Sequence, residues 1–302
     1  MGAQLRIYRQ KIKSAQTTKK ITRAMELISA SRIQKAQARM TAAAPYTRAL
    51  TRAVTAVAVG SNVDHPLTNQ SGDHRRAAVV VFASDRGLAG AFSSQILRET
   101  GELAEKLKDE GKEVVYYLVG RKSLSNFSFR QRAWVRDWIG GTDRPEVETA
   151  KEIADAVIEH FLKSYEDGGV DEIHLVYNRF VNLVSQVPSV LRLLPLEVVE
   201  ADESEPMPVG DDVLPLYEFE PDGSAVLDTL LPVFVENRIF AAMLSSAAAE
   251  HAARQKAMKS ATDNADKLIQ NYTRLANNAR QSEITQQISE IVGGADALVS
   301  AK

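Results

Sequence analysis

Apolar and small residues recur at helical spacing along both ends of the chain, and helix breakers are rare there. Between Gly2 and Gly60 the only breaker is Pro45, so residues 3–59 are predicted to form one helix that bends near Thr41. Residues 233–292 contain neither proline nor glycine. This second segment predicts a single helix about 90 Å long at about 1.5 Å per residue.

Small and apolar side chains in both segments repeat about every 3.5 residues, which is the spacing of a coiled coil. The C-terminal stripe is Val235, Ile239, Ala242, Ser246, Ala249, Ala253, Ala257, Ala261, Ala265, Leu268, Tyr272, Leu275 and Ala279. The N-terminal helix offers Leu5, Ile12, Ile21, Met25, Ile28 and Ile33. Small seam residues let two helix axes approach closely, and both helices join the same middle segment. An antiparallel pair is therefore predicted, although the N-terminal helix alone could instead pack on the middle domain.

The middle segment alternates between strand-like and helix-like stretches. Apolar runs rich in β-branched and aromatic residues predict strands at 77–84, 113–120, 172–178 and 191–199, the last at a sheet edge because it contains Pro195. Helix-like stretches at 94–110 and 146–165 separate them. The expected fold class is α/β: a long antiparallel coiled coil on a small Rossmann-like domain with a largely parallel sheet. The expected division is shaft helix 1–60, α/β base 61–231 and shaft helix 232–302.

Composition narrows the possible classes of protein. The chain has 302 residues, 44% hydrophobic and 25% charged, as in ordinary soluble proteins. It contains no cysteine, which excludes disulfides, cysteine-liganded zinc and thiol nucleophiles. The longest apolar run, residues 77–83, is far shorter than the roughly 20 residues of a membrane span, so we expect any membrane association to be peripheral.

Charge is distributed unevenly along the chain, although the net charge is only -2. Residues 1–60 hold twelve Lys and Arg against the single acid Glu26, a net charge of +11. Residues 61–232 hold 17 basic and 31 acidic residues, a net charge of -14. A basic arm of this kind indicates a polyanionic or acidic partner, or else a solvated helix face.

No constellation of catalytic residues stands out. The loop "SDRGLAGAFSS" lies between a strand and a helix, but it has neither phosphate-binding glycine spacing nor a following lysine, so a tight turn with close packing is the better interpretation. The five histidines are scattered, and the acidic tract 200–212 reads as a linker. We expect a non-catalytic protein that needs no cofactor and no metal.

Two function classes survive these observations. One is a mechanical or scaffolding subunit whose shaft enters a protein assembly, and the other is a nucleic-acid-binding module led by the basic helix. The basic arm has only two aromatic residues, Tyr8 and Tyr46, and it lacks sustained leucine heptads. The mechanical interpretation is favoured.

Four long motifs resemble one known family. They are "KITRAMELISASRIQKAQ" (20–37), "SDRGLAGAF" (84–92), "ENRIFAAMLSSAAAEHAARQKAMKSATDNADKLI" (236–269) and "ARQSEITQQISEIVGGADA" (279–297). Together they resemble the gamma subunit of the F-type ATP synthase, of bacterial type. The C-terminal signature matches at Ile284, Thr285, Glu290, Gly294 and Ala295. It departs at Gln287, where the family usually has an acid.

The resemblance implies a central rotor stalk that couples rotation of an ion-driven membrane ring to ATP synthesis, or to hydrolysis in reverse. Its implied partners are three alpha and three beta subunits, the epsilon subunit and the membrane c-ring, with one copy per complex and no nucleic acid. The implied contacts to the catalytic head are Met25, Arg254, Arg280, Gln281, Thr285 and Gln287. The implied basic shaft face is Lys11, Lys13, Lys19, Lys20 and Arg23, and the implied foot contacts are Tyr217, Glu220 and Asp222.

The resemblance also bears on localisation. The first 60 residues look like a transit peptide in composition, but family similarity begins within residues 5–14. We therefore expect a bacterial peripheral membrane protein on the cytoplasmic side of the plasma membrane.

Overall fold

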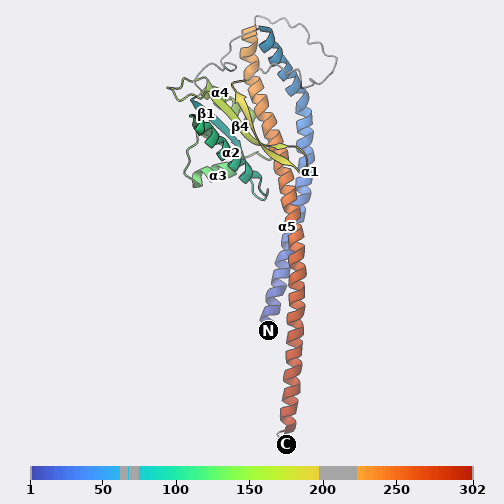
Figure 1. Cartoon of the computed structure of the whole chain (residues 1–302). Helices are drawn as coiled ribbons and strands as arrows, with labels where there is room; N and C mark the ends of the chain where they lie inside the picture. The colour runs from blue at the N-terminus through green and yellow to red at the C-terminus, as the bar shows by residue number, and fades with distance from the viewer. Residues whose placement is uncertain (1, 62–66, 68–74, 197–222, 301–302) are drawn as a thin grey trace. The chain divides into compact units, whose positions relative to one another are not determined.

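The computed structural model describes residues 2–61, 67, 75–196 and 223–300, with side chains described for residues 3–57, 67, 75–196 and 223–293 (Figure 1). The chain forms two compact units. Unit 1 comprises Met1–Ser29 and Arg254–Lys302, and unit 2 comprises Ala30–Ala253. Each unit is described by itself.

Two long helices supply all of unit 1 and part of unit 2. Helix α1 spans Gly2–Ser61 and contains Pro45, and helix α5 spans Gly223–Ser300. Both predicted long helices are therefore confirmed, but α5 begins ten residues before the expected start and includes Pro232. A proline inside a helix costs about 3 kcal/mol. Burial of Leu227 and Leu231, which are 1% and 0% exposed, offsets that cost because each buried leucine contributes about 1.5–3 kcal/mol.

Unit 2 contains a five-stranded mixed sheet in the order β3-β2-β1-β4-β5. The strands are β1 (Arg76–Phe82), β2 (Glu113–Val119), β3 (Arg136–Trp138), β4 (Glu172–Phe180) and β5 (Gln186–Leu194). The pairs β1/β2, β1/β4 and β2/β3 are parallel, whereas β5 is an antiparallel edge strand. The predicted α/β class, largely parallel sheet and edge position of the last strand are confirmed.

Three shorter helices complete unit 2: α2 (Phe92–Asp109), α3 (Arg121–Phe129) and α4 (Val147–Phe161). The sequence pattern predicted α2 and α4 but missed α3 and β3, which are short. Helix α3 follows Gly120, whose φ of 94° is left-handed and whose added Cβ would lie 2.3 Å from the carbonyl oxygen of Ala83. Only glycine fits this backbone position, so the strand turns directly into the helix.

The sheet separates two apolar cores because alternate residues of each strand point to opposite faces. On one face Ala78, Val80 and Phe82 of β1 pack with α4, α1 and α5. On the other face Ala77, Val79 and Val81 pack with α2 and α3. Within unit 2, α5 is buried on every side from Ala242 to Glu250. Small alanine and serine side chains there allow helix and sheet to approach closely.

Helix α5 also holds one stretch that by length and composition alone could cross a membrane. The sequence analysis expected no such stretch. However, 56% of it is buried within the protein, as in the core helix of a soluble protein. Its apolar character is therefore accounted for by internal packing.

Candidate functional site

The two helical segments of unit 1 run antiparallel. The Thr22 and Thr262 hydroxyls are 2.8 Å apart, and Lys19 Nζ lies 2.6 Å from Asp266 Oδ1. The rings of Tyr8 and Tyr272 stack with centroids 6.5 Å apart. The residue numbers of the α5 partners increase as those of the α1 partners decrease, so the two segments run antiparallel. The predicted coiled-coil pair is confirmed for this unit.

The seam between these segments differs from the predicted stripe. Its buried members in α1 are Ala15, Thr22, Glu26 and Ser29, and those in α5 include Met258, Thr262, Ala265 and Ala276. The predicted seam residues Leu268, Ile21 and Ile28 are instead about half exposed. The prediction was wrong at these positions because it counted large apolar residues. Closely approaching helices instead bury small side chains and hydroxyls that bond to each other.

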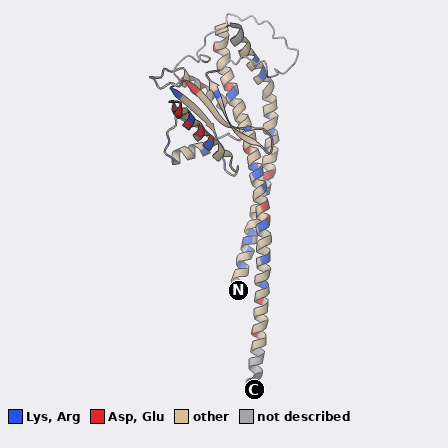
Figure 2. Ribbon diagram, in the orientation of Figure 1, with Lys and Arg blue, Asp and Glu red and all other residues tan. Residues whose placement is uncertain are grey.

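The basic residues of the α1 segment in unit 1 lie mostly at the surface, and Figure 2 marks their positions in blue along the ribbon. Lys11, Lys13, Lys20 and Arg23 are exposed, whereas Lys19 is half-buried beside Asp266. Lys11 Nζ lies 5.3 Å from the centroid of the Tyr272 ring, and Arg23 Nη1 lies 2.9 Å from Glu26 Oε2. These residues form an exposed basic face, part of which also stabilises the helix pair.

The C-terminal part of α5 continues past the start of α1. Because Tyr8 stacks on Tyr272 and α1 begins at Gly2, no α1 residue in the described structure lies opposite α5 beyond about residue 280. Figure 1 shows this unaccompanied helix end. The predicted contact residues Arg280, Gln281, Thr285 and Gln287 all lie here, and all are exposed.

The same helix end also carries an apolar stripe that was not among the predicted site residues. Ile284, Ile288 and Ile291 follow at i, i+4 and i+7, and with Val292 they are 45% to 72% exposed. Arg280 and Gln287 share this helix face, because they lie four residues before Ile284 and Ile291. The spacing was visible in the sequence. Exposed apolar stripes of this kind are typical of surfaces that bind another protein.

The remaining predicted site residues lie elsewhere. Met25 is half-buried, and Arg254 is buried at 6% exposure, so Arg254 presents much less surface than Arg280. Tyr217, Glu220 and Asp222 lie outside the described residues. The structure thus brings Arg280, Gln281, Thr285 and Gln287 together on one segment and does not bring Arg254 to the surface.

The loop "SDRGLAGAF" lies in unit 2 at the carboxyl end of β1, beside β4. Ligands of open α/β sheets bind at such a position, where the strand order reverses. Here Ala89 and Phe92 pack directly on Ala249 of α5, with Phe180 beside them. Protein side chains therefore fill the crevice, in agreement with the predicted close packing.

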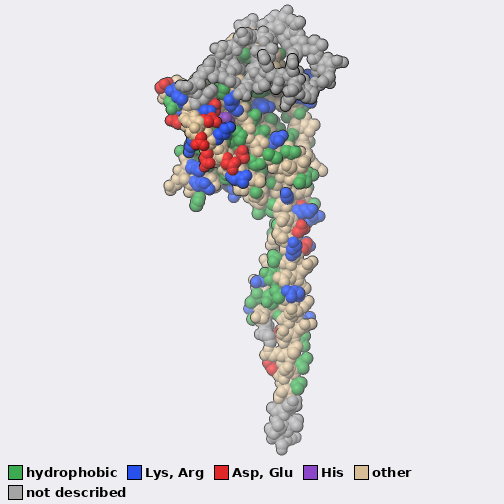
Figure 3. Space-filling view, in the orientation of Figure 1, with side chains coloured by type: hydrophobic (Ala, Val, Ile, Leu, Met, Phe, Trp, Pro, Cys, Tyr) green, Lys and Arg blue, Asp and Glu red, His purple; other side chains and the backbone are tan. Residues whose placement is uncertain are grey.

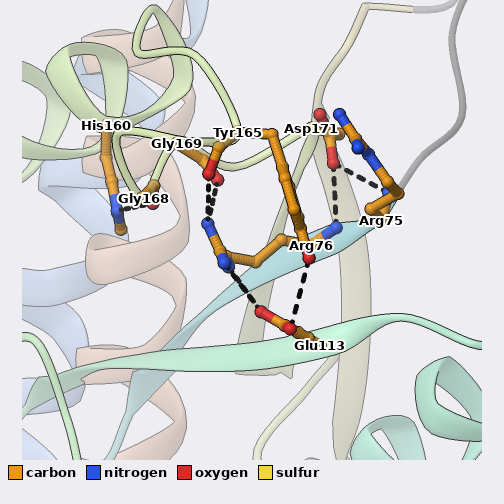
Figure 4. Close-up of polar contacts among 8 residues, drawn as sticks. All are labelled: Arg75, Arg76, Glu113, His160, Tyr165, Gly168, Gly169 and Asp171. Carbon is orange, nitrogen blue, oxygen red and sulfur yellow. Dashed lines mark hydrogen bonds and ion pairs between the residues drawn. The ribbon is translucent and has the colours of Figure 1, made fainter.

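A network of charged residues lies at the other end of the strands, where β1, β2 and β4 begin (Figure 4). Arg76 contacts Glu113 Oε2 at 2.8 Å and donates to the carbonyl oxygen of Gly169 at 2.9 Å. The Arg75 and Arg76 amides donate to Asp171 Oδ2, both at 2.8 Å. The hydrogen bond and charge of Arg76 lower the pKa of Glu113. This network joins the starts of β1, β2 and β4.

His160 connects the same network to the core. Its Nε2 donates to the carbonyl oxygen of Gly168 at 2.7 Å, so Nδ1 accepts from the Tyr117 hydroxyl, also at 2.7 Å. Burial lowers the pKa of His160 and raises that of Tyr117 to about 12. Both groups therefore stay neutral near pH 7, and the network acts as a structural support for the turn at 164–169.

The other charged residues in the described part of the chain form no evident reaction centre. Acidic side chains gather over the α/β part of unit 2 in Figure 3, on α2 in particular. Among the described residues, no group of three or more His, Asp or Glu side chains is placed to hold a metal ion.

The fold defines the class of protein: a coiled coil of two terminal helices joined to a Rossmann-like α/β domain. A family model described as ATP synthase matches residues 4–298. The ATP synthase gamma chain of Clavibacter sepedonicus is 69% identical over 302 residues and covers all of both chains. That of Kineococcus radiotolerans is 60% identical over 301 residues, covering 100% of this chain and 99% of the relative.

Solved structures share the fold. A chain of the Euglena gracilis mitochondrial ATP synthase, solved with OSCP, F1 and the c-ring, has a TM-score of 0.68 at 17% identity, covering 100% of this chain and 97% of that chain. A chain of the Tetrahymena thermophila mitochondrial ATP synthase, from a structure of the central stalk and c-ring, has a TM-score of 0.56 at 22% identity. The match covers 80% of this chain and 99% of that chain. The chain belongs to the ATP synthase gamma-chain family.

Proposed function

We propose that this chain is the central rotor stalk of a bacterial F-type ATP synthase. In this role it couples ion-driven rotation of the membrane ring to ATP synthesis, or to ATP hydrolysis in reverse. The observation that carries the proposal is the exposed end of α5, where Arg280, Gln287 and the stripe of Ile284, Ile288 and Ile291 lie on one face without an α1 partner among the described residues. Such a surface requires a protein that encloses it.

The partners follow from this role. The proposed complex has three alpha and three beta subunits, one copy of this chain, the epsilon subunit and the c-ring. The names of the gamma-chain relatives support it, as do the similar chains from structures described as a rotor, a central stalk and F1 with a c-ring. Nucleic acid has no part in this proposal.

Individual parts of the chain receive separate roles. Arg280, Gln281, Thr285 and Gln287 would meet the catalytic head, with Met25 and Arg254 nearer the paired region. The exposed basic face of α1 would meet acidic segments of the head. The segment containing Tyr217, Glu220 and Asp222 would meet the ring and the epsilon subunit. In this assignment residues 1–60 and 232–302 are the shaft and 61–231 the base.

The chain would perform no bond chemistry itself. The packing of Phe92 on Ala249 in the sheet crevice supports this, because side chains occupy the position of a bound nucleotide. Its place would be peripheral, on the cytoplasmic side of the plasma membrane, held there by the membrane ring.

The proposal is tested by purification from membranes. A tagged chain should recover alpha and beta subunits in a 1:3:3 ratio, and Arg280→Glu should lower coupled ATP synthesis while leaving that ratio unchanged. The control is Arg98→Glu on α2, which is similarly exposed but lies in unit 2. Recovery with nucleic acid in place of these subunits would overturn the proposal, and unchanged synthesis in the Arg280 variant would remove Arg280 from the contact surface.

A further inference from the structure

One loop of unit 2 contacts both long helices. Residues 140–145 have the sequence "GGTDRP", and Gly140 and Gly141 adopt left-handed φ angles of 95° and 78°. Residues other than glycine rarely adopt such angles, so these two positions determine the course of the loop.

The "SDRGLAG" motif holds this loop in place. The Asp85 carboxylate accepts hydrogen bonds from the amides of Arg121, Gly140 and Thr142 at 3.0 to 3.1 Å. In return the Asp85 amide donates to the Thr142 hydroxyl at 3.0 Å. Burial opposes ionisation of Asp85, but the hydrogen bonds outweigh it and lower its pKa. Asp85 is therefore a charged acceptor at neutral pH, which strengthens each bond.

The far side of the loop meets α1 and α5. Asp143 Oδ2 lies 2.6 Å from Arg32 Nη1 of α1, and the Arg39 guanidinium donates to the carbonyl oxygen of Pro145. From α5, His251 Nε2 donates to the carbonyl oxygen of Asp143 at 2.9 Å. The Thr142 hydroxyl lies 3.4 Å from Glu250 Oε2. Asp143 thus contacts one helix through its side chain and the other through its backbone.

Apolar packing and these polar contacts resist different motions. The hydrophobic interaction in the core beneath the sheet has no preferred direction. It therefore opposes separation of helix and sheet more than rotation of one against the other. Hydrogen bonds weaken steeply when their angle changes, so a set that joins one loop to two helices opposes rotation. Loop 140–145 therefore constrains the angle of both helices at once.

We propose that loop 140–145, held by Asp85, is the joint through which torque passes between the α/β base and both shaft helices, with Asp143 as its positioning residue. This inference rests on the proposed rotor function. The "SDRGLAG" motif lies where open α/β sheets commonly bind a ligand. In this inference the motif has a mechanical role instead.

The test uses the full complex in membrane vesicles and measures protons pumped per ATP hydrolysed. Asp143→Leu replaces the carboxylate by a larger apolar side chain without an acceptor, and it should lower this ratio about three- to fivefold, the size of one coupling in a hydrogen-bonded network. Asp143→Asn keeps the acceptor for Arg32 and should stay within about twofold of the parent. Glu159→Gln weakens an exposed pair between Glu159 of α4 and Lys163 just beyond the helix, and it serves as the control, with no expected change.

Ratios are compared at equal amounts of assembled complex. Should Asp143→Leu fail to assemble, Arg32→Met removes the same contact from the half-buried α1 side and should lower the ratio similarly. The proposal that this loop is the joint would be overturned if the ratio were unchanged in these variants, or if Asp143→Asn lowered the ratio as much as Asp143→Leu. Failure of the unaltered chain to recover alpha and beta subunits would instead overturn the rotor function itself.

Discussion

The exposed isoleucine stripe on α5 leads to a quantitative prediction. Replacing Ile284, Ile288 and Ile291 together by alanine should leave the free chain almost as stable as before, because these side chains are already largely exposed. Alanine also has the better helix propensity. The same replacement should weaken assembly with the head, where the stripe would be buried.

The magnitude follows from the exposed fractions. Full burial of an isoleucine contributes about 1.5–3 kcal/mol, and these three side chains are 45%, 56% and 72% exposed, so the surface left to bury contributes about 1 kcal/mol or slightly more at each. Three such losses total about 3–4 kcal/mol. Since 1.4 kcal/mol is tenfold, the affinity for the head should fall by about 10² to 10³.

The assay is the dissociation constant of the chain for purified alpha and beta subunits, with thermal unfolding of the free chain alongside. Val184→Ala is the matched control, because Val184 is an aliphatic residue 76% exposed on the loop between β4 and β5 in unit 2. It should change neither quantity. If the triple variant binds the head as tightly as the parent, the stripe is not the contact surface.

Two further predictions concern the base. Hydrogen bonds from Lys112 and His174 outweigh burial and lower the pKa of Glu172 to about 2, so its stabilisation is complete above about pH 4.5 and is lost as the pH falls towards 2. Glu172→Gln should therefore lower the free energy of unfolding at pH 7, and urea titrations should show this difference shrinking through that window; a constant difference would contradict the assignment. Gly169→Ala should destabilise the folded protein by about 3 kcal/mol, because the added Cβ would lie 2.0 Å from the Lys163 carbonyl oxygen. In Gly101→Ala in α2 the added Cβ meets nothing within 4 Å, so this variant should be more stable by about 0.5–1 kcal/mol. Equal effects of the two replacements on the melting temperature would contradict this.

Much of the fold was predictable because long segments carry strong periodic signals. The absence of breakers in residues 233–292 predicted α5, and runs such as 77–83 predicted buried strands. The start of α5 was not predictable from local sequence, since Pro232 is tolerated only because Leu227 and Leu231 fill the core. Strand β3 has only three residues, too few for a periodic signal.

The candidate site was predictable in part. Motif resemblance led to Arg280, Gln281, Thr285 and Gln287, which the structure places together and exposed. Beyond residue 257 the predicted seam agrees with the structure at Ala265, but elsewhere it lies one residue before the buried positions Met258, Thr262 and Ala276. In that region small and polar residues occupy several faces of the helix, and pairs such as Thr22 with Thr262 and Lys19 with Asp266 show which face meets α1. Long-range pairs of this kind leave no local signal in the sequence.

Rotation of this chain within the catalytic head can be observed in single molecules. Because the chain has no cysteine, Phe129→Cys at an 89% exposed position of α3 provides one labelling site for a rotational probe. With alpha and beta subunits fixed to a surface, the probe should rotate in one direction as soon as ATP is added. A probe that stays still, or that fluctuates equally with and without ATP, would contradict the proposed rotation.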